Sequence, residues 1–525
     1  MAIGLSACGG DNDSKGGDTV NLVDPAPANS STVTLRVMET TDLHANIMNF
    51  NYYQNAEDNT VGLVKTASLI AAARAEVDNS VLVDNGDLLQ GSPLGDYVAK
   101  IKGLVANDVH PIYKAMNLLS YDAANIGNHE FNYGLENLYQ YVDHVDATIL
   151  NSNLLDHKTQ KPFRGIAYDI LKTAGPTIGI IGVTTHYIPN WEQPSHIKGL
   201  DILDAFETTK ELVIKLRKEV DLLIVNYHGG FERDLDTFVL SAEDTGENQG
   251  SKMLQEIDGI DILLTGHQHR LLHGHTHNTT YSQPGFNAQY LMELNIEGTF
   301  DKTWHFDIKS TLHNTVGIAP NQDVLNLIQT DEQHTQTYLD TPVGHLDQDH
   351  LITNQLEARL HKHPLVSFIN QVQLEYTHAD IASCSLGNDV SGFRKDITIR
   401  DIISTYVYPN TVVVKSMTGA EIIKAIEKTA SFFTIKNNNI EISDEFNTPK
   451  LQLYAYDMYD PIDYTIDVSK PVGSRVSNIT LHDITIQPDQ SYTVAMNNYR
   501  ASGGGDYFFI KDCPIVNDTQ IEVIE

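Results

Sequence analysis

The sequence SVLVDNGD, at residues 80–87, is the most informative part of the chain. Its first half is apolar and rich in β-branched residues, which predicts a buried strand at 80–83. Residues 67–77 just before it carry apolar side chains at helical spacing and predict a helix. A helix, a buried strand and then a polar cluster is typical of α/β proteins, in which ligands gather at the carboxyl ends of the strands.

The same order recurs on both sides of this stretch. Ordered structure is expected to begin with the β-branched alternation at 32–37. Further helices are predicted at 112–119, 206–220 and 252–257, each followed by a strand, at 123–126, 222–226 and 260–264. This alternation indicates an α/β or layered α/β sandwich at residues 31–315.

The pattern changes after about residue 309, and 525 residues are more than one core usually supports. We expect a Gly/Pro/Asn-rich flexible lead at 1–30, a linker helix within 316–340 and a second domain at 341–525. Within the second domain we predict helices at 364–376 and 419–429, and strands at 412–414, 464–468 and 491–495.

Composition limits the possible partners. The chain has 69 acidic and 35 basic residues, a formal charge of -34, which argues against binding to the phosphate backbone of DNA or RNA. Hydrophobic residues make up 41% of the chain, enough for well-packed cores, but the sequence as given contains no apolar run of membrane-spanning length. We expect a monomer that binds a small molecule.

The three cysteines bear on location. The stretch LSAC at residues 5–8 resembles a bacterial lipobox, and a polar Gly/Asp/Ser-rich stretch follows Cys8. The basic and apolar regions of a signal peptide do not precede it, so an unmodified flexible N-terminus is the alternative. We expect a periplasmic or cell-envelope protein, attached to a membrane only through a lipid on Cys8. For Cys384 and Cys513, a disulfide and two buried free thiols both stay open.

Five short motifs follow predicted strands in the first domain. They are Asp42-Leu43-His44, Gly86-Asp87, Gly127-Asn128-His129-Glu130, His228 with its following glycines, and Gly266-His267-Gln268-His269. Imidazole and carboxylate ligands suit Zn, Mn, Fe or Co, and a carboxylate can bridge two ions. Each motif alone is weak evidence, since polar residues at strand ends usually serve local hydrogen bonds. Their succession on consecutive strand ends predicts a site for two divalent metal ions.

A second Gly-His-x-His motif lies close by, at residues 274–277. Gly266 follows the apolar run at 260–264, whereas Gly274 follows no such run. We therefore assign His267 and His269 as metal ligands and expect His275 and His277 to lie in a loop.

The order of the motifs resembles the calcineurin-like metallophosphoesterases, and within them the two-domain 5'-nucleotidase family. The resemblance covers about residues 32–510 and rests on TTDLH (40–44), VDNGDLLQGSP (83–93), GNHEFNYG (127–134) and NNYRA (497–501). It implies an α/β/β/α sandwich that carries the metals and a second, α+β domain that recognises the nucleotide.

The resemblance also implies roles for individual residues. Asp42, His44, Asp87 and His269 would hold one ion, and Asp87, Asn128, His228 and His267 the other. His129 would be the catalytic residue that stabilises the transition state or the leaving oxygen. Tyr408 and Tyr507, the latter chosen ahead of Phe508, would sandwich the nucleobase by stacking. Packing in the core is the alternative for Tyr507.

Two departures distinguish branches of the family. In the 5'-nucleotidase branch, the residue three after the catalytic histidine is usually Asp and the last metal motif usually ends in Gln; here they are Asn132 and His269. Both favour the branch that hydrolyses 2',3'-cyclic nucleotides to 3'-nucleotides, and these to nucleoside and phosphate, in nucleotide catabolism. A 5'-nucleotidase or UDP-sugar hydrolase and a non-catalytic nucleotide-binding lipoprotein are the alternatives.

Overall fold

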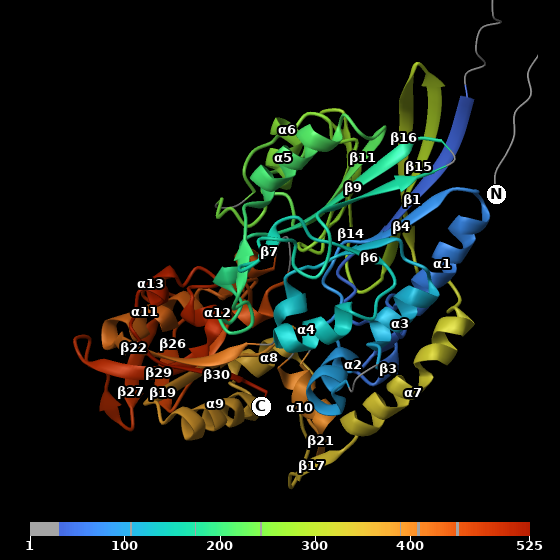
Figure 1. Cartoon of the computed structure of the whole chain (residues 1–525). Helices are drawn as coiled ribbons and strands as arrows, with labels where there is room; N and C mark the ends of the chain where they lie inside the picture. Colours follow the sequence, from blue (N-terminus) through green and yellow to red (C-terminus); the bar gives the residue numbers. More distant parts are fainter. Residues whose placement is uncertain are drawn as a thin grey trace, which may run out of the picture.

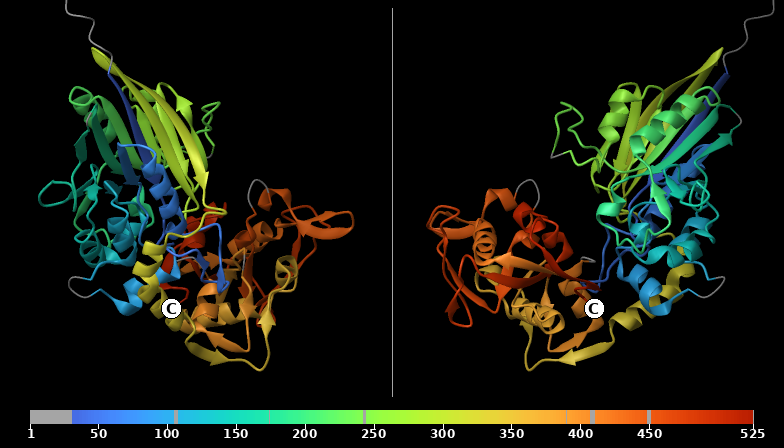
Figure 2. Two further views of the ribbon diagram at one scale, coloured as in Figure 1. Left: turned by 90° about the vertical axis from the view of Figure 1, so that its right-hand side faces the viewer. Right: turned by 60° about the vertical axis from the view of Figure 1, so that its left-hand side comes forward.

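The computed structural model describes residues 31–524, apart from 105–107, 174, 242–243, 389, 407–409 and 448–450. Figures 1 and 2 show two lobes, a large sandwich and a smaller second domain, which the chain connects through helix α7 (Gln322–Leu339). Within the described part of the chain, no helix is both long enough and apolar enough to cross a membrane.

Two six-stranded sheets form the centre of the first domain. The first contains, in order, β16 (Thr303–Asn314), β15 (Tyr290–Asp301), β1 (Ser31–Thr40), β4 (Ser80–Asp84), β5 (Ala123–Asn125) and β6 (Thr148–Leu150). The second contains β13 (Leu271–Thr276), β14 (Thr279–Pro284), β12 (Ile262–Thr265), β11 (Leu222–His228), β9 (Thr177–Thr184) and β8 (Tyr168–Lys172). The pairs β1–β4, β4–β5, β9–β11 and β11–β12 are parallel, so their carboxyl ends lie at one edge of each sheet.

The two sheets pack face to face and are covered by helices on their outer faces. Side chains such as Val37, Val83, Ile224 and Leu264 fill the space between the sheets. Helices α1 (Leu63–Ala75), α3 (Pro111–Leu118) and α4 (Gly134–Val142) share a core with the first sheet. Helices α5 (Ala205–Leu216) and α6 (Gly250–Glu256) cover the second sheet. The α/β/β/α sandwich expected from the sequence is confirmed.

Helix α5 ends four residues before the expected end at residue 220. It begins where the Asp204 side chain accepts a hydrogen bond from the Glu207 backbone N–H. It ends where the Arg217 guanidinium donates to the backbone carbonyls of Val220 and Asp221. These bonds satisfy carbonyls in the turn that the chain makes to enter β11, and helical periodicity alone does not reveal them.

The second domain is built on a five-stranded sheet, in the order β25 (Asp457–Asp460), β19 (Ile381–Ser385), β29 (Ser491–Asn497), β22 (Thr411–Thr418) and β30 (Ile515–Glu522). Helices α9 (Pro364–Thr377) and α11 (Gly419–Ala430) lie where the sequence predicts them. Helix α10 (Ile399–Thr405) carries Arg400, whose guanidinium donates to the Tyr52 carbonyl of the first domain and to Asp340 at the end of α7. These bonds tie the two domains together beside the linker helix.

Two expectations are settled within these domains. Cys384 and Cys513 are both buried free thiols in this structure, which selects that alternative over the disulfide. The expected loop at residues 274–277 is wrong, because His275 lies on β13, paired with Thr280 of β14. The polar alternation of β13 is that of a half-exposed edge strand, for which no apolar run is needed. His277 lies just beyond this strand.

The buried His110 predicts a pH dependence of stability. It precedes α3, its Nδ1 accepts a hydrogen bond from the Ile112 backbone N–H, and burial lowers its pKa from 6.5 to about 3. The unfolded chain therefore takes up a proton on His110 that the folded chain does not. The contribution of neutral His110 to the free energy of unfolding is fully present above pH 6.5 and is lost as the pH falls. We expect His110→Asn, which keeps a capping acceptor, to abolish this contribution. Between pH 7 and 5 the variant should therefore lose about 2 kcal/mol less free energy of unfolding than the wild type. Urea unfolding of both proteins at these pH values measures it; parallel pH profiles would contradict it.

Candidate metal centre

The candidate ligands lie at the carboxyl ends of five central strands. Asp42 and His44 follow β1, Asp87 follows β4, and Asn128 follows β5. His228 is the last residue of β11, and His267 and His269 follow β12. The two sheets therefore bring residues 42 to 269 together at one edge of the sandwich, as the sequence predicts for ligands of an α/β sheet.

Five of these seven residues have left-handed backbone conformations. The φ angles are 51° at Asp42, 49° at His44, 60° at Asp87, 68° at His267 and 57° at His269. Such angles are costly for residues other than glycine and concentrate where function requires a defined side-chain direction. The turns after these strands are thus shaped to aim side chains.

The side chains form two clusters in which the ligand atoms all lie within 4.8 Å of one another. One consists of Asp42, His44 and His269, and the other of Asp87, His228 and His267. Asn128 adjoins the second, with its Oδ1 3.1 Å from His228 Nε2. The grouping has the form that the family resemblance implies; the binding of metal and the sharing of Asp87 between two ions stay predictions.

The donor set fits divalent cations. His44 Nδ1 lies 2.6 Å from the Gln90 carbonyl and His228 Nδ1 lies 3.0 Å from the Asn85 carbonyl. Since a carbonyl only accepts, each Nδ1 donates, and each Nε2 is the ring nitrogen left to bind a cation. The buried Asp87 Oδ2 lies 3.1 Å from His228 Nε2 and is otherwise unpartnered among the described residues. This oxygen therefore keeps a lone pair with which it could bind a cation.

The pKa values of the cluster residues also favour a cation site. Burial opposes ionisation of Asp87, but His228 and His129 outweigh it and hold the pKa of Asp87 well below its ordinary value. Burial lowers the pKa of His44 to about 4. Burial acts against protonation of His228 as well, but Asp87 and Asp42 raise its pKa to about 9. A cation binding at His228 Nε2 would take the place of that proton.

Glu130 is a site residue for which the sequence motifs predict no separate role. Its buried carboxylate accepts hydrogen bonds from the backbone N–H groups of Asp87, Leu88, Leu89 and Gly127. These bonds join the turn after β4 to the turn after β5. A Cβ added at Gly127 would lie 2.3 Å from Asp87 Oδ1, so only glycine permits this approach. The motif position of Glu130, next to His129, was the available signal.

His129 lies beside a cavity of about 220 Å³ at the edge of the cluster. Asn128, His267 and Trp191 line this cavity with it. The His129 backbone N–H donates to Asp87 Oδ1, and its ring meets the ring of His44 edge-on at 5.3 Å. The structure therefore places His129, the expected catalytic residue, in the wall of a cavity that Asn128 and His267 of the second cluster also line.

The expected aromatic clamp needs a correction. Tyr408 lies outside the described residues. Tyr507 is only 1% exposed, its hydroxyl lies 2.7 Å from Thr429 Oγ1, and it packs in the core of the second domain. A ring without a free face cannot stack on a base, so the assignment of Tyr507 is wrong. Two rings of the same segment are exposed, Tyr499 at 45% and Phe508 at 63%, and Tyr499 packs against Gly504.

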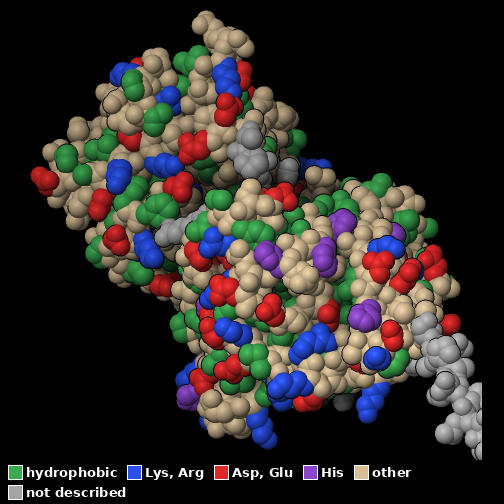
Figure 3. Space-filling view, turned by 90° about the horizontal axis from the view of Figure 1, so that it is seen from above, with side chains coloured by type: hydrophobic (Ala, Val, Ile, Leu, Met, Phe, Trp, Pro, Cys, Tyr) green, Lys and Arg blue, Asp and Glu red, His purple; other side chains and the backbone are tan. Residues whose placement is uncertain are grey.

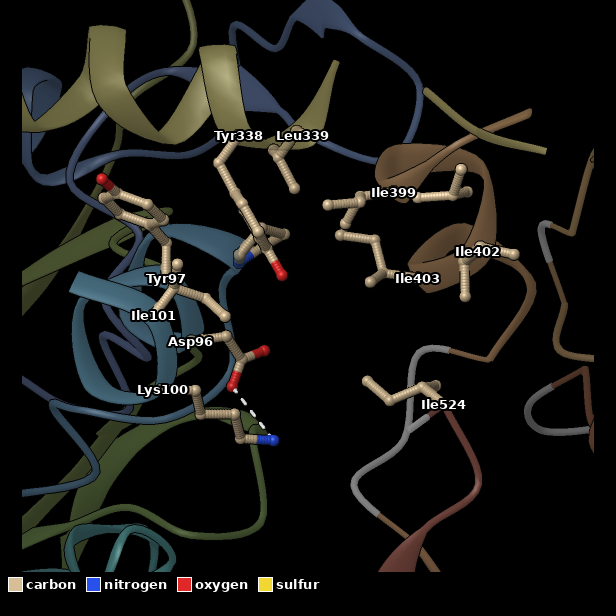
Figure 4. A pocket seen from close by; sticks show the side chains of 12 residues that line it. Asp96, Tyr97, Lys100, Ile101, Tyr338, Leu339, Ile399, Ile402, Ile403 and Ile524 are labelled. Carbon is tan, nitrogen blue, oxygen red and sulfur yellow. Dashed lines mark ion pairs between the residues drawn. The ribbon is translucent and has the colours of Figure 1, made fainter. Parts of the chain in front are cut away.

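A larger cavity of about 510 Å³ lies between the two domains (Figure 4). Its wall is mainly apolar, with Tyr97, Tyr338, Ile399 and Ile403 among its residues, and none of the seven candidate ligands contributes to it. On the face shown in Figure 3, acidic and basic side chains are interspersed over both lobes, so the excess negative charge is not gathered in one patch of that face.

Both domains match known protein families. Residues 35–271 match the model of the calcineurin-like phosphoesterases, and residues 342–512 match the model of the 5'-nucleotidase C-terminal domain. The chain is 32% identical to a Salmonella typhimurium protein named 2',3'-cyclic-nucleotide 2'-phosphodiesterase/3'-nucleotidase, over 91% of this chain and 83% of that protein. A Yersinia enterocolitica protein of the same name is also 32% identical, over 91% and 82% of the two chains.

A solved structure is similar over nearly the whole length. A Staphylococcus aureus protein described as a 5'-nucleotidase superposes with a TM-score of 0.81 and 33% identity, covering 94% of this chain and 95% of that one. The similarity extends through both domains and the linker between them.

Proposed function

This chain belongs to the 5'-nucleotidase family of calcineurin-like metallophosphoesterases, and on that premise we propose that it hydrolyses 2',3'-cyclic nucleotides and 3'-nucleotides. It is a metal-dependent phosphoric ester hydrolase that opens the cyclic ester at the 2' oxygen and then releases the 3' phosphate, leaving a nucleoside. The support is the 32% identity, over most of the chain, to proteins named for these two activities.

The observation that carries the proposal is the convergence of two His/Asp clusters at one edge of the sandwich, in which His228 is the one partner of Asp87 Oδ2 among the described residues. We propose that these clusters bind two divalent ions, from among Zn, Mn, Co and Fe. When bound, such ions activate water for attack on phosphorus and offset charge on the phosphoryl oxygens. They would also supply positive charge next to the substrate phosphate. This local charge outweighs the formal charge of -34 on the chain as a whole, whose effect salt screens beyond about 8 to 10 Å.

The chain's own residues position the substrate around this centre. His129, at the cavity, is placed to donate a hydrogen bond to a phosphoryl oxygen or to the leaving oxygen. Glu130 binds the turn of Asp87 and the turn of Gly127 together, so the Asp87 carboxylate and His129 keep their relative positions. The second domain offers the exposed Tyr499 ring to the nucleobase.

Substitution of Tyr499 tests the base contact. We expect Tyr499→Ala to raise KM for 3'-AMP about tenfold, because base stacking contributes about 1–3 kcal/mol. Turnover of p-nitrophenyl phosphate, which has no base, should stay unchanged. Tyr507→Phe is the matched control: it removes the hydroxyl paired with Thr429, and should lower the melting temperature without a base-specific effect. Equal KM values for wild type and Tyr499→Ala would contradict the assignment.

Side-by-side turnover of three substrates tests the proposed activity. Mn-loaded enzyme is given 2',3'-cyclic AMP, 3'-AMP and 5'-AMP, and nucleoside and phosphate are measured over time. We expect turnover of the first two, with 3'-AMP appearing transiently from the cyclic substrate. Dominant hydrolysis of 5'-AMP would instead support the 5'-nucleotidase alternative, which the similarity to the Staphylococcus aureus protein keeps open. Binding of nucleotide without hydrolysis would favour a binding lipoprotein.

We also propose an envelope location with a lipid on Cys8, which lies outside the described residues. The lipobox-like LSAC stretch and the polar stretch after it support this. Metabolic labelling of the full-length protein with an alkyne fatty acid, beside Cys8→Ser, tests it. Label that depends on Cys8 is expected, and label-free protein in the soluble fraction would overturn it.

A further inference from the structure

Glu192 is a buried carboxylate beside the catalytic cavity that no sequence motif predicted. It follows the short helix η3 (Ile188–Asn190), in the chain segment after β9. It lines the cavity with His129 and Asn132, yet its side chain is only 6% exposed. A carboxylate facing a site for anionic phosphate would repel the substrate, so its contacts must explain its presence.

Both oxygens of the Glu192 carboxylate are hydrogen-bonded. Oε2 lies 2.9 Å from Asn132 Nδ2, and Oε1 lies 2.8 Å from the Gln193 backbone nitrogen and 2.9 Å from His196 Nδ1. An ionised carboxylate only accepts hydrogen bonds, so each of these three groups must donate to it. Glu192 therefore has a donor on each oxygen and holds these neighbours in place.

These bonds decide the orientation of Asn132. Its NH₂ group must face Glu192, which turns its Oδ1 to His129 Nδ1 at 2.6 Å. That oxygen also only accepts, so His129 Nδ1 must carry a hydrogen. His129 Nε2 is then the ring nitrogen left to face a substrate in the cavity, and the ring donates to a phosphoryl or leaving oxygen through a second hydrogen, on Nε2. Without Glu192, the Asn132 amide could turn over and donate to Nδ1, and the ring could then no longer carry hydrogen on both nitrogens.

We propose that Glu192 is a positioning residue for the hydrolytic reaction, acting through Asn132 to hold the His129 ring with Nδ1 as donor and Nε2 toward the phosphoryl group. This inference rests on the proposed function. The Asn132–Glu192 pair does in two steps what a carboxylate at position 132 would do directly: it fixes the ring and places a negative charge behind it. The departure at Asn132 is thereby compensated from a distant segment of the chain.

The decisive variants are Glu192→Gln, alone and with Asn132→Asp. With Glu192→Gln, one amide oxygen faces three donors, so Asn132 loses its fixed acceptor. We expect kcat for 3'-AMP to fall about 10- to 100-fold, the usual effect of losing such an outer hydrogen bond, with KM, metal content and melting temperature unchanged. Adding Asn132→Asp should restore kcat to within about threefold of wild type, because the new carboxylate accepts from both His129 and the new amide. Asn132→Asp alone brings the new carboxylate against that of Glu192, and their repulsion should lower kcat.

His196→Asn is the matched control, since it removes another side-chain partner of Glu192 and leaves Asn132 alone. If Glu192 only holds its own loop, His196→Asn and Glu192→Gln will be equally impaired, and the double variant will not recover; that result would overturn the proposal. Wild-type kcat in Glu192→Gln would overturn it as well.

A spectroscopic measurement separates this proposal from the proposed function. Proton-coupled ¹⁵N spectra of histidine-labelled enzyme, assigned with His129→Asn, report which ring nitrogen of His129 carries hydrogen. Hydrogen on Nδ1 in the wild type and a mixture of Nδ1 and Nε2 forms in Glu192→Gln are expected. This holds even if the wild type fails to hydrolyse nucleotides, which would refute the proposed function alone. Identical His129 signals in both proteins would refute the positioning role.

Discussion

Asp87→Asn is expected to lower kcat/KM for 2',3'-cyclic AMP about a thousandfold or more. Asp87 Oδ1 accepts from the His129 N–H at 2.7 Å, and the amide can keep that bond, but it cannot supply the charge or the second oxygen that Oδ2 offers beside His228. Loss of one ion removes several kcal/mol of transition-state stabilisation, and each 1.36 kcal/mol is a factor of ten in rate. Phosphate release and metal analysis of the same samples measure the effect, and the variant should hold less than two ions per chain.

Asp84→Asn is the matched control for this substitution. Asp84 is also buried, three residues earlier, and burial raises its pKa to about 8, so it is largely neutral at pH 7. It bonds the Gly86 N–H and the Thr40 hydroxyl rather than facing either cluster. We expect less than a tenfold loss of activity. Comparable losses in both variants would mean that Asp87 acts through folding of the turn, against our assignment.

The second large effect is expected for His129→Ala, which should lower kcat for 3'-AMP about 10²–10³-fold at unchanged metal content. General acid catalysis and a hydrogen bond to a developing oxyanion each contribute effects of this order. Because the backbone N–H of residue 129, not its ring, bonds Asp87, both clusters should remain intact. Steady-state kinetics and metal analysis test this, with the exposed His157→Ala as control. Loss of bound metal would instead make His129 a structural support of the centre.

The sandwich and the meeting of the candidate ligands at one edge of it could be predicted from the sequence because both depend on local patterns. A buried strand such as 80–84 determines where the following turn lies, and parallel neighbours place the turns at one edge. Asp42 and His269, 227 positions apart in the chain, needed no long-range information beyond the strand that precedes each.

The parts that the sequence did not predict depend on contacts between distant segments. Glu192 follows no motif, and its relation to Asn132 exists only because the segment after β9 folds over the turn after β5. Tyr499 and Tyr507 lie eight residues apart in one Gly-rich segment, and spacing does not tell which ring turns inward. Burial settles it, since the Arg500 guanidinium lies 4.0 Å above the buried Tyr507 ring.

If the account is right, the His/Asp clusters bind two metal ions that are needed for hydrolysis. The most direct test is to strip the protein with a chelator, titrate it with Mn²⁺, and follow bound metal and 3'-AMP hydrolysis together. We predict no turnover in the stripped protein and a rise to full activity at two bound ions per chain. Undiminished turnover by verifiably metal-free protein would contradict the account.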